Sequence, residues 1–586
     1  MAAMTIAGLR HAYASGGLTP LAVVDEIFAR IDEMGERPIW ISLADREEVR
    51  RRAATVDMSL PLAGIPFAVK DNIDVAGLPT TAACPSFAYQ PERSATVVQR
   101  LVDAGAIVIG KTNLDQFATG LVGVRSPYGA CANAFDDRFI AGGSSSGSAL
   151  ALVKGLCAFS LGTDTAGSGR VPAAFGGLIG LKPTKGLLST TGVVPACRSL
   201  DCVSVFAVTA DDAEAVWSVA REPDPADAYS REMGTGADAA PWLSGPFRFG
   251  VPDAGELTFF GDEDSARLFE RAAARLEAIG GVRTTIDFAP FRETAQLLYA
   301  GPWVAERFAA VGAFLASSPE GVDQTVAGII ATGATYSAVD AYRAAEQLET
   351  LRKRARAIWQ TMDVLVVPTA GTIYTREAVA AEPVRLNTNL GYYTNFVNLL
   401  DLAAVSVPSG ARPTGVPFGV SVIGQAFTDC ALLDLASRMM GDPGGTTLTP
   451  QGCVSVAVVG AHLTGQPLNH QLTSRGARLV RACRTAPCYR LFALPNTTPP
   501  KPGLVRVEEQ VGRGIEVEVW AVPEATFGGF VAAIPPPLGI GRVQLDSGEW
   551  VSGFICEPVG LTGAEDITAC GGWRRYLAAG LAETAR

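Results

Sequence analysis

The chain has 586 residues, more than a single hydrophobic core normally supports, so we expect at least two domains. Hydrophobic residues make up 48% and charged residues 18%, a balance that excludes extensive disorder. The 59 acidic residues outnumber the 48 basic ones, and the net charge of −11 disfavours nucleic acids and anionic membranes as partners.

The cysteines and the N-terminus bear on the cellular compartment. Eleven cysteines are spread along the chain without a CxxC pair, which argues against a disulfide framework and a zinc site. The N-terminus lacks the pattern of a signal peptide, and no stretch reaches about 18 apolar residues. We therefore expect a cytoplasmic protein with reduced thiols and no metal.

The first 55 residues predict helices. Thr19 is a typical N-cap, Pro20 suits the first helical position, and residues 21–32 carry an amphipathic pattern. We expect a helical lead-in over residues 1–55.

Residues 56–440 have the pattern of an α/β domain, in which short β-branched runs alternate with Ala-rich helical segments. This pattern predicts a large mixed sheet covered by helices. A helix-rich insert at about residues 264–362 is expected to form one wall of a substrate site. Strands are predicted at residues 65–70, 106–110, 156–162, 364–369 and 403–408.

A change of texture separates the end of the chain. Residues 441–452, GDPGGTTLTPQG, predict a linker, and residues 453–586 predict a smaller β-rich α+β domain. Its expected strands include residues 454–459, 490–494, 503–510, 514–522 and 529–534.

Two Ser/Gly loops in residues 140–177 carry the chemistry. A helix over residues 145–156 rises about 18 Å, and a returning strand of six or seven residues covers roughly 20 Å. The displacements nearly cancel, so the loop of Ser144 is predicted to lie near the loop of Ser168, at the sheet edge where ligands of α/β proteins usually bind. Taken singly, each loop is more typical of a flexible turn.

A serine nucleophile needs a base, and histidine is nearly absent from the chain. Only His11, His462 and His470 occur, none near the serine loops in sequence. A buried lysine can act as a base because burial favours its neutral form. Lys70, at the end of an apolar run, is the candidate, although such a lysine can equally be a surface residue or pair with a neighbouring aspartate.

Two other motifs match formally and are set aside. Residues 143–147 fit the GxSxG elbow with Ser145 at its centre, but the preceding segment is a poor strand. Residues 105–112 fit GxxxxGK[ST], but their middle residues predict a strand where a phosphate cradle needs a glycine-rich loop.

Several ordered motifs together resemble the amidase signature family, over about residues 60–424. The motifs are GIPFAVKDN, GKTNLDQFATG, GGSSSGSA, DTAGSGR, GLIGLKPTKG, SLD and GVPFGVSVIG. Ser146 departs from the family's usual glycine.

The resemblance implies a Ser-Ser-Lys triad. It makes Lys70 the neutral base, Ser144 a relay serine in a cis peptide bond, and Ser168 the nucleophile. It also implies an oxyanion hole of backbone N–H groups from Thr165, Ala166, Gly167 and Ser168, and no cofactor.

Within this family the chain is similar to the allophanate hydrolases, whose resemblance covers nearly the whole sequence. It implies release of ammonia and N-carboxycarbamate from allophanate, ending in ammonia and carbon dioxide, after a biotin-dependent urea carboxylase in urea degradation. It places Tyr299 and Arg307 at the substrate, about two turns apart on one helix face. An exposed arginine and a core tyrosine are the alternative.

The C-terminal domain resembles gamma-glutamyl cyclotransferase-like modules. Val459 and Gly460 replace the Tyr-Gly of active cyclotransferases, so we do not expect that activity. The domain is expected either to process the first product, with His462 as a possible participant, or to stabilise a homodimer.

Two further functions stay open at this stage. One is an amidase of the same mechanism acting on another small amide, including ammonia supply in a transamidation complex. The other is a non-catalytic scaffold within a urea carboxylase complex.

Overall fold

The computed structural model describes residues 4–35, 37–233, 247–317, 319–441, 453–512, 514–546 and 548–577. The chain divides into two compact units, Met1–Met440 and Gly441–Arg586. The predicted linker at residues 441–452 lies almost wholly outside the described residues. Each unit is described by itself.

The first unit is built on one mixed sheet of eleven strands. The three strands β3, β2 and β4 run parallel, as do β8, β7 and β9, whereas the strands between these groups pair antiparallel. In spatial order the strands are β1 (Trp40–Leu43), β3 (Ile107–Thr112), β2 (Pro66–Lys70), β4 (Phe159–Thr163), β6 (Val203–Ala207), β5 (Ile179–Lys182), β10 (Leu402–Ala411), β11 (Pro417–Gln425), β9 (Val364–Pro368), β7 (Phe247–Pro252) and β8 (Gly281–Ile286).

Helices cover the sheet, and every residue of β2, β4, β5, β6 and β9 is buried. Burial on both faces explains why these strands appear in the sequence as continuous apolar runs rather than alternating ones. The predicted strands at 65–70, 106–110, 156–162, 364–369 and 403–408 correspond to β2, β3, β4, β9 and β10 and are confirmed.

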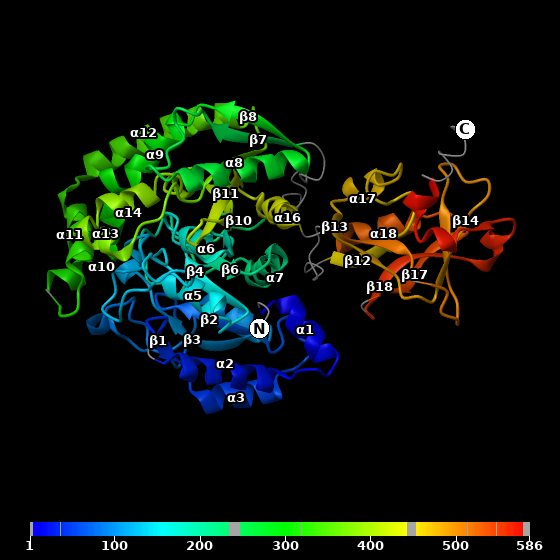
Figure 1. Ribbon diagram of the computed structural model, residues 1–586, viewed down its shortest axis with the longest axis horizontal. Coiled ribbons are helices and arrows are strands. Elements are labelled where there is room, and N and C mark those ends of the chain that lie inside the picture. The colour runs from blue at the N-terminus through cyan, green and yellow to red at the C-terminus, as the bar shows by residue number, and fades with distance from the viewer. Residues whose placement is uncertain are drawn as a thin grey trace. The chain divides into compact units, whose positions relative to one another are not determined.

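The helices of this unit follow the alternation that the sequence predicts (Figure 1). Thr19 caps α2 by accepting a hydrogen bond from the Ala22 N–H, as expected. The helices are α1 (Ile6–Ala14), α2 (Pro20–Met34), α3 (Arg46–Thr55), α4 (Thr96–Asp103), α5 (Ser146–Val153), α6 (Val171–Gly176), α7 (Ala210–Ala220), α8 (Glu263–Ala278), α9 (Ala289–Ala300), α10 (Val304–Ala316), α11 (Gln324–Ala331), α12 (Ala338–Trp359), α13 (Arg376–Ala381), α14 (Arg385–Leu390), α15 (Phe396–Leu399) and α16 (Asp429–Met440).

One region differs from the prediction, and a second contains a strand besides its predicted helices. The lead-in over residues 1–55 is not purely helical, because Trp40–Leu43 forms β1 and pairs antiparallel with β3 at the sheet edge. The insert at 264–362 is rich in helices, as predicted, and also contains a strand, β8, which pairs parallel with β7 at the other edge. Both are edge strands, and each forms by pairing with a strand that is distant in sequence. The local sequence pattern does not reveal such a partner.

The second unit contains a five-stranded sheet and a three-stranded sheet. Residues 529–534, predicted as a strand, lie mostly in helix α18, because a short apolar run without alternation does not distinguish helix from strand. The elements are β12 (Cys453–Val458), α17 (His470–Thr473), β13 (Arg478–Arg484), β14 (Tyr489–Ala493), β15 (Pro502–Arg506), β16 (Glu516–Pro523), α18 (Glu524–Ala532), β17 (Leu538–Gln544), β18 (Trp550–Cys556) and β19 (Glu565–Asp566).

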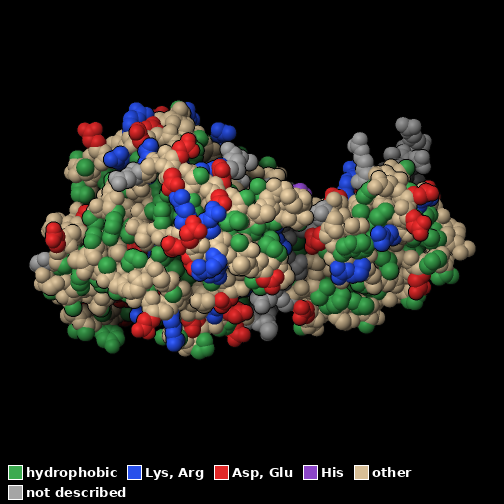
Figure 2. All heavy atoms as spheres, turned by 90° about the horizontal axis from the view of Figure 1, so that it is seen from below, with side chains coloured by type: hydrophobic (Ala, Val, Ile, Leu, Met, Phe, Trp, Pro, Cys, Tyr) green, Lys and Arg blue, Asp and Glu red, His purple; other side chains and the backbone are tan. Residues whose placement is uncertain are grey.

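The described surface mixes charges of both signs. Figure 2 shows basic and acidic side chains interspersed over one face, with scattered hydrophobic ones between them. Among the described helices, none is both long and apolar enough to cross a membrane.

Candidate active site

Lys70 ends the central parallel strand β2 and is completely buried. Its Nζ lies 2.7 Å from the Ser144 Oγ and 2.7 Å from the Thr163 Oγ1. Burial lowers the pKa of Lys70 from 10.5 to about 7, although three nearby carboxylates oppose this effect. The amine is therefore available as a base near neutral pH.

Ser144 lies in the loop before α5, where the Gly143–Ser144 peptide bond is cis, as the resemblance implies. Asp115 clamps this loop. Its N–H donates to the Ser144 carbonyl, and its carboxylate accepts the N–H groups of Gly123 and Arg125. A Cβ at Gly143 would lie 2.1 Å from the Asp115 carboxylate, so only glycine fits beside Ser144.

Ser168 lies in the loop between β4 and α6, and its side chain is buried. Among the described residues, nothing forms a hydrogen bond with its hydroxyl, which leaves the oxygen free to attack a carbonyl carbon. The structure brings Lys70 and Ser144 into direct contact, and the Ser145 hydroxyl bonds to the backbone of Thr163, five residues before Ser168.

The backbone N–H groups around Ser168 are engaged unequally. Gly167 donates its N–H to the Asp164 carboxylate at 2.7 Å. Within the described part of the chain, the N–H groups of Thr165, Ala166 and Ser168 have no such partner. These three can therefore bind an oxyanion, whereas the Gly167 N–H instead shapes the loop.

Tyr299 and Arg307 face each other from two helices rather than one. Helix α9 ends at Ala300 and α10 begins at Val304, so the expectation that one helix carries both residues is wrong. Their contact survives, with the Arg307 guanidinium 5.6 Å from the ring centroid and 3.4 Å from the Tyr299 hydroxyl.

Arg307 is 3% exposed, which rules out the alternative of a surface arginine. It donates to the Thr119 hydroxyl at 3.0 Å and to the Ala118 carbonyl. Its charge also contributes to the lowered pKa of Lys70. The guanidinium therefore lies within electrostatic reach of the lysine.

Sequence reasoning missed three contributors. Thr163 contacts Lys70, Asp201 accepts the Thr165 hydroxyl at 2.5 Å, and Arg170 forms a buried ion pair with Asp164. Thr163 and Arg170 lie next to the DTAGS segment, and Asp201 is part of the SLD motif. Their closeness to these motifs in the sequence is the only signal that could have identified them. Their roles depend on contacts across the fold.

The two formal motifs have structural roles instead. Residues 105–112 lie mainly in β3, and Lys111 pairs with the Asp71 carboxylate at 3.1 Å, so no phosphate cradle forms. Ser145 is buried and its hydroxyl is committed to Thr163.

In the second unit, His462 lines a cavity of about 260 Å³. Its Nε2 lies 3.0 Å from the Gln471 Oε1, and its ring stacks on Phe554 at 4.8 Å. Burial lowers the pKa of His462, which favours the neutral ring. No group of metal-ligating side chains occurs among the described residues.

Known proteins resemble the chain over both units. The amidase family model matches residues 22–433, and the model of the allophanate hydrolase C-terminal domain matches residues 454–578. A urea amidolyase from Lachancea kluyveri is 46% identical over 92% of this chain, which spans only 31% of that protein. A second urea amidolyase, from Saccharomyces cerevisiae, is 45% identical over 93% of this chain, which spans 32% of that protein.

A solved structure covers almost the whole length of both chains. It is the selenomethionine-substituted allophanate hydrolase of Kluyveromyces lactis, which is 44% identical and aligns with a TM-score of 0.75 over 98% of this chain and 99% of its own. From the extent of the family match and the identity to these relatives, the chain belongs to the amidase family.

Proposed function

We propose that the chain hydrolyses allophanate, urea-1-carboxylate, with Ser168 as the nucleophile. The observation that carries the amidase chemistry is the 2.7 Å contact between the buried Lys70 Nζ and the Ser144 Oγ, at a lysine whose pKa is about 7. The only histidine of the first unit, His11, lies exposed in α1. A lysine base accounts for serine chemistry without histidine.

The proposed reaction proceeds through an acyl-enzyme. Ser168 attacks the amide carbonyl, and its proton passes through Ser144 to Lys70. The N–H groups of Thr165, Ala166 and Ser168 bind the oxyanion. Return of the proton to the leaving nitrogen releases ammonia, and water activated by the same relay releases the N-carboxycarbamate acyl group.

The substrate assignment rests on Arg307 and Tyr299. A buried guanidinium without a carboxylate partner among the described residues can form two hydrogen bonds with the carboxylate of allophanate. The phenol supplies one more donor. The name of the Kluyveromyces lactis relative supports this choice over a neutral amide.

We extend the proposal to the pathway and the assembly. N-carboxycarbamate would break down to a second ammonia and carbon dioxide, and a biotin-dependent urea carboxylase would supply allophanate. The urea amidolyase names of the longer relatives support this link. A homodimer in the cytoplasm is part of the same proposal.

The second unit is proposed to act on N-carboxycarbamate at the cavity that holds His462 and Lys501, a neutral ring and a cation suited to an anion. Replacing His462 by alanine should slow carbon dioxide release and leave the first ammonia unchanged. An equal loss of both products would contradict this assignment.

The test of the main proposal is ammonia release by the purified protein from allophanate, malonamide and a peptide amide. Allophanate should give the highest kcat/KM, and Ser168→Ala should remove turnover of all three while the unfolding midpoint is kept. Equal rates on the three amides would refute the substrate, whereas activity in Ser168→Ala would refute the mechanism. An activity-based serine probe that labels the wild type but not Ser168→Ala separates an enzyme from a scaffold.

A further inference from the structure

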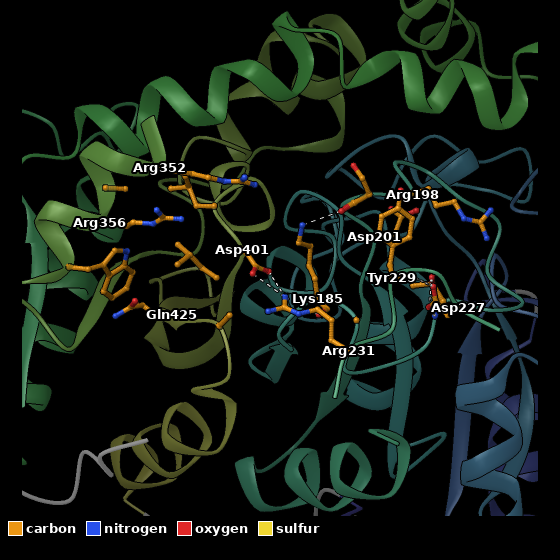
Figure 3. A pocket seen from close by; sticks show the side chains of 18 residues that line it. Lys185, Arg198, Asp201, Asp227, Tyr229, Arg231, Arg352, Arg356, Asp401 and Gln425 are labelled. Carbon is orange, nitrogen blue, oxygen red and sulfur yellow. Dashed lines mark hydrogen bonds and ion pairs between the residues drawn. The ribbon is translucent and has the colours of Figure 1, made fainter. Parts of the chain in front are cut away.

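A cavity of about 420 Å³ lies in the first unit, between α12 and loops that follow β5, α7 and α15 (Figure 3). None of the described residues that line it is among the predicted catalytic or substrate-binding ones. Its volume falls in the range of small-molecule sites. It has no role in the mechanism above.

The charge of the lining is opposite to that of the whole chain, whose net charge is −11. Five cationic side chains line the cavity against three carboxylates. The cations are Lys185, Arg198, Arg231, Arg352 and Arg356, and the carboxylates belong to Asp201, Asp227 and Asp401.

The three carboxylates are already committed. Asp201 accepts the Thr165 hydroxyl and two backbone N–H groups, and Asp227 accepts the N–H and hydroxyl of Thr190. Asp401 pairs with Arg231 through contacts of 2.8 and 3.0 Å. These bonds occupy oxygens of all three carboxylates with donors from the protein itself.

The cations are less fully used. Arg356 extends from α12 toward the side that holds Asp401, and within the described part of the chain it has neither a hydrogen bond nor an ion pair (Figure 3). Arg198 likewise has neither within the described part of the chain, but its guanidinium points away from Lys185 and Arg356 (Figure 3). Lys185 donates to a single carbonyl, that of Ser199, and burial lowers the pKa of its ammonium group. An anion in the cavity would offset that cost.

We propose that this cavity binds a small organic dianion, a dicarboxylate or a phosphate monoester, through Lys185 and Arg356. Two negative charges match the surplus of five cations over three carboxylates, and the planar fork of arginine fits both carboxylate and phosphate oxygens. Trp359, Leu400 and Leu402 add an apolar wall against which a short carbon chain can lie.

Binding must be measured directly, because two lining residues also touch the predicted catalytic region. Asp201 bonds to Thr165, and Ser199 bonds to Glu306, the neighbour of Arg307. A change in activity alone would therefore not locate the ligand.

The experiment is calorimetric titration of the full chain with succinate and with inorganic phosphate. Arg356→Ala and Lys185→Ala should each weaken binding by about tenfold, the loss expected for one charge-assisted contact. Lys353→Ala removes the same charge from an exposed position of α12 outside the cavity and should change the affinity less than twofold. Stronger binding of succinate would identify a dicarboxylate, and stronger binding of phosphate a phosphate monoester.

Three outcomes would overturn the proposal. The first is that neither probe binds. The second is that Lys353→Ala weakens binding as much as Arg356→Ala, which indicates a diffuse electrostatic field. The third is that Arg307→Ala abolishes binding that Arg356→Ala leaves intact, which places the anion at the catalytic site. Matching unfolding midpoints of the variants establish that each is folded. The result is independent of which amide Ser168 cleaves.

Discussion

Two lysines on neighbouring strands are completely buried, and different partners surround them. Lys111 on β3 faces the Asp71 carboxylate, whose charge opposes the lowering of its pKa by burial. Lys70 on β2 faces two hydroxyl groups, and its pKa falls to about 7. A lysine becomes a base where burial is not matched by an adjacent carboxylate.

The pKa of Lys70 predicts the pH dependence of the reaction. The relay needs the neutral amine, so raising the pH through about 7 removes the inhibiting proton and increases activity. We expect kcat/KM for malonamide, which carries no charge, to rise about tenfold per pH unit below 7 and to level off above it. A profile that is flat or falls across this range would exclude Lys70 as the base.

Arg307 is predicted to set the preference for an anionic substrate. Arg307→Ala should lower kcat/KM for allophanate roughly ten- to hundredfold, because a charge-assisted bidentate contact is lost. This decrease corresponds to about 1.5 to 3 kcal/mol of transition-state stabilisation. Because a neutral amide lacks the carboxylate, the ratio of allophanate to malonamide activity isolates this contact from any general damage. An unchanged ratio would remove Arg307 from substrate recognition.

At the scale of elements, the loop from β4 to α6 is held by one aspartate. Asp164 accepts the N–H groups of Gly167 and Gly169 and pairs with Arg170, entirely out of solvent. Burial opposes its ionisation, but Arg170, Lys182 and the Gly167 N–H together lower its pKa. The predicted nucleophile thus lies on a loop fixed from within.

Neutralising this aspartate should destabilise the fold. Asp164→Asn leaves the Arg170 charge buried without a counterion, so we expect the free energy of unfolding to fall by about 3 to 5 kcal/mol. Glu293→Gln removes the same charge from the exposed pair with Arg354 and should cost less than about 1 kcal/mol. Urea unfolding of both variants measures the difference, and equal losses would contradict it.

Local pattern predicted the central elements and failed at the periphery. The apolar runs of β2, β4 and β9 are specified by their own residues, whereas the Lys70 to Ser144 contact was expected only from the family resemblance. Strand β1 depends on pairing with β3, and the end of α9 before Gly301 is not evident from the local sequence pattern. The roles of Thr163 and Asp201 likewise required three-dimensional proximity.

At the scale of the molecule, the two units have separate hydrophobic cores. The second unit buries its own cluster, which includes Val456, Val519, Trp520 and Phe530. All the predicted catalytic and substrate-binding residues lie in the first unit. We therefore propose that each unit can fold without the other.

A chain that ends at Met440 tests this proposal. It should unfold cooperatively and release ammonia from malonamide at the rate of the full chain, because no described catalytic contact involves the second unit. Ammonia assays and denaturant unfolding measure the two properties. An insoluble or inactive fragment would show that the second unit supports the first.

The strand β1 closes one edge of the large sheet, with β3 and then the lysine-bearing β2 behind it. An uncovered strand edge presents unpaired backbone groups that template pairing with another chain. A chain shortened beyond residue 43 would expose β3 in this way and favour aggregation or strand exchange between molecules. We therefore expect β1, which lies two strands away from the lysine-bearing β2, to limit aggregation of the chain.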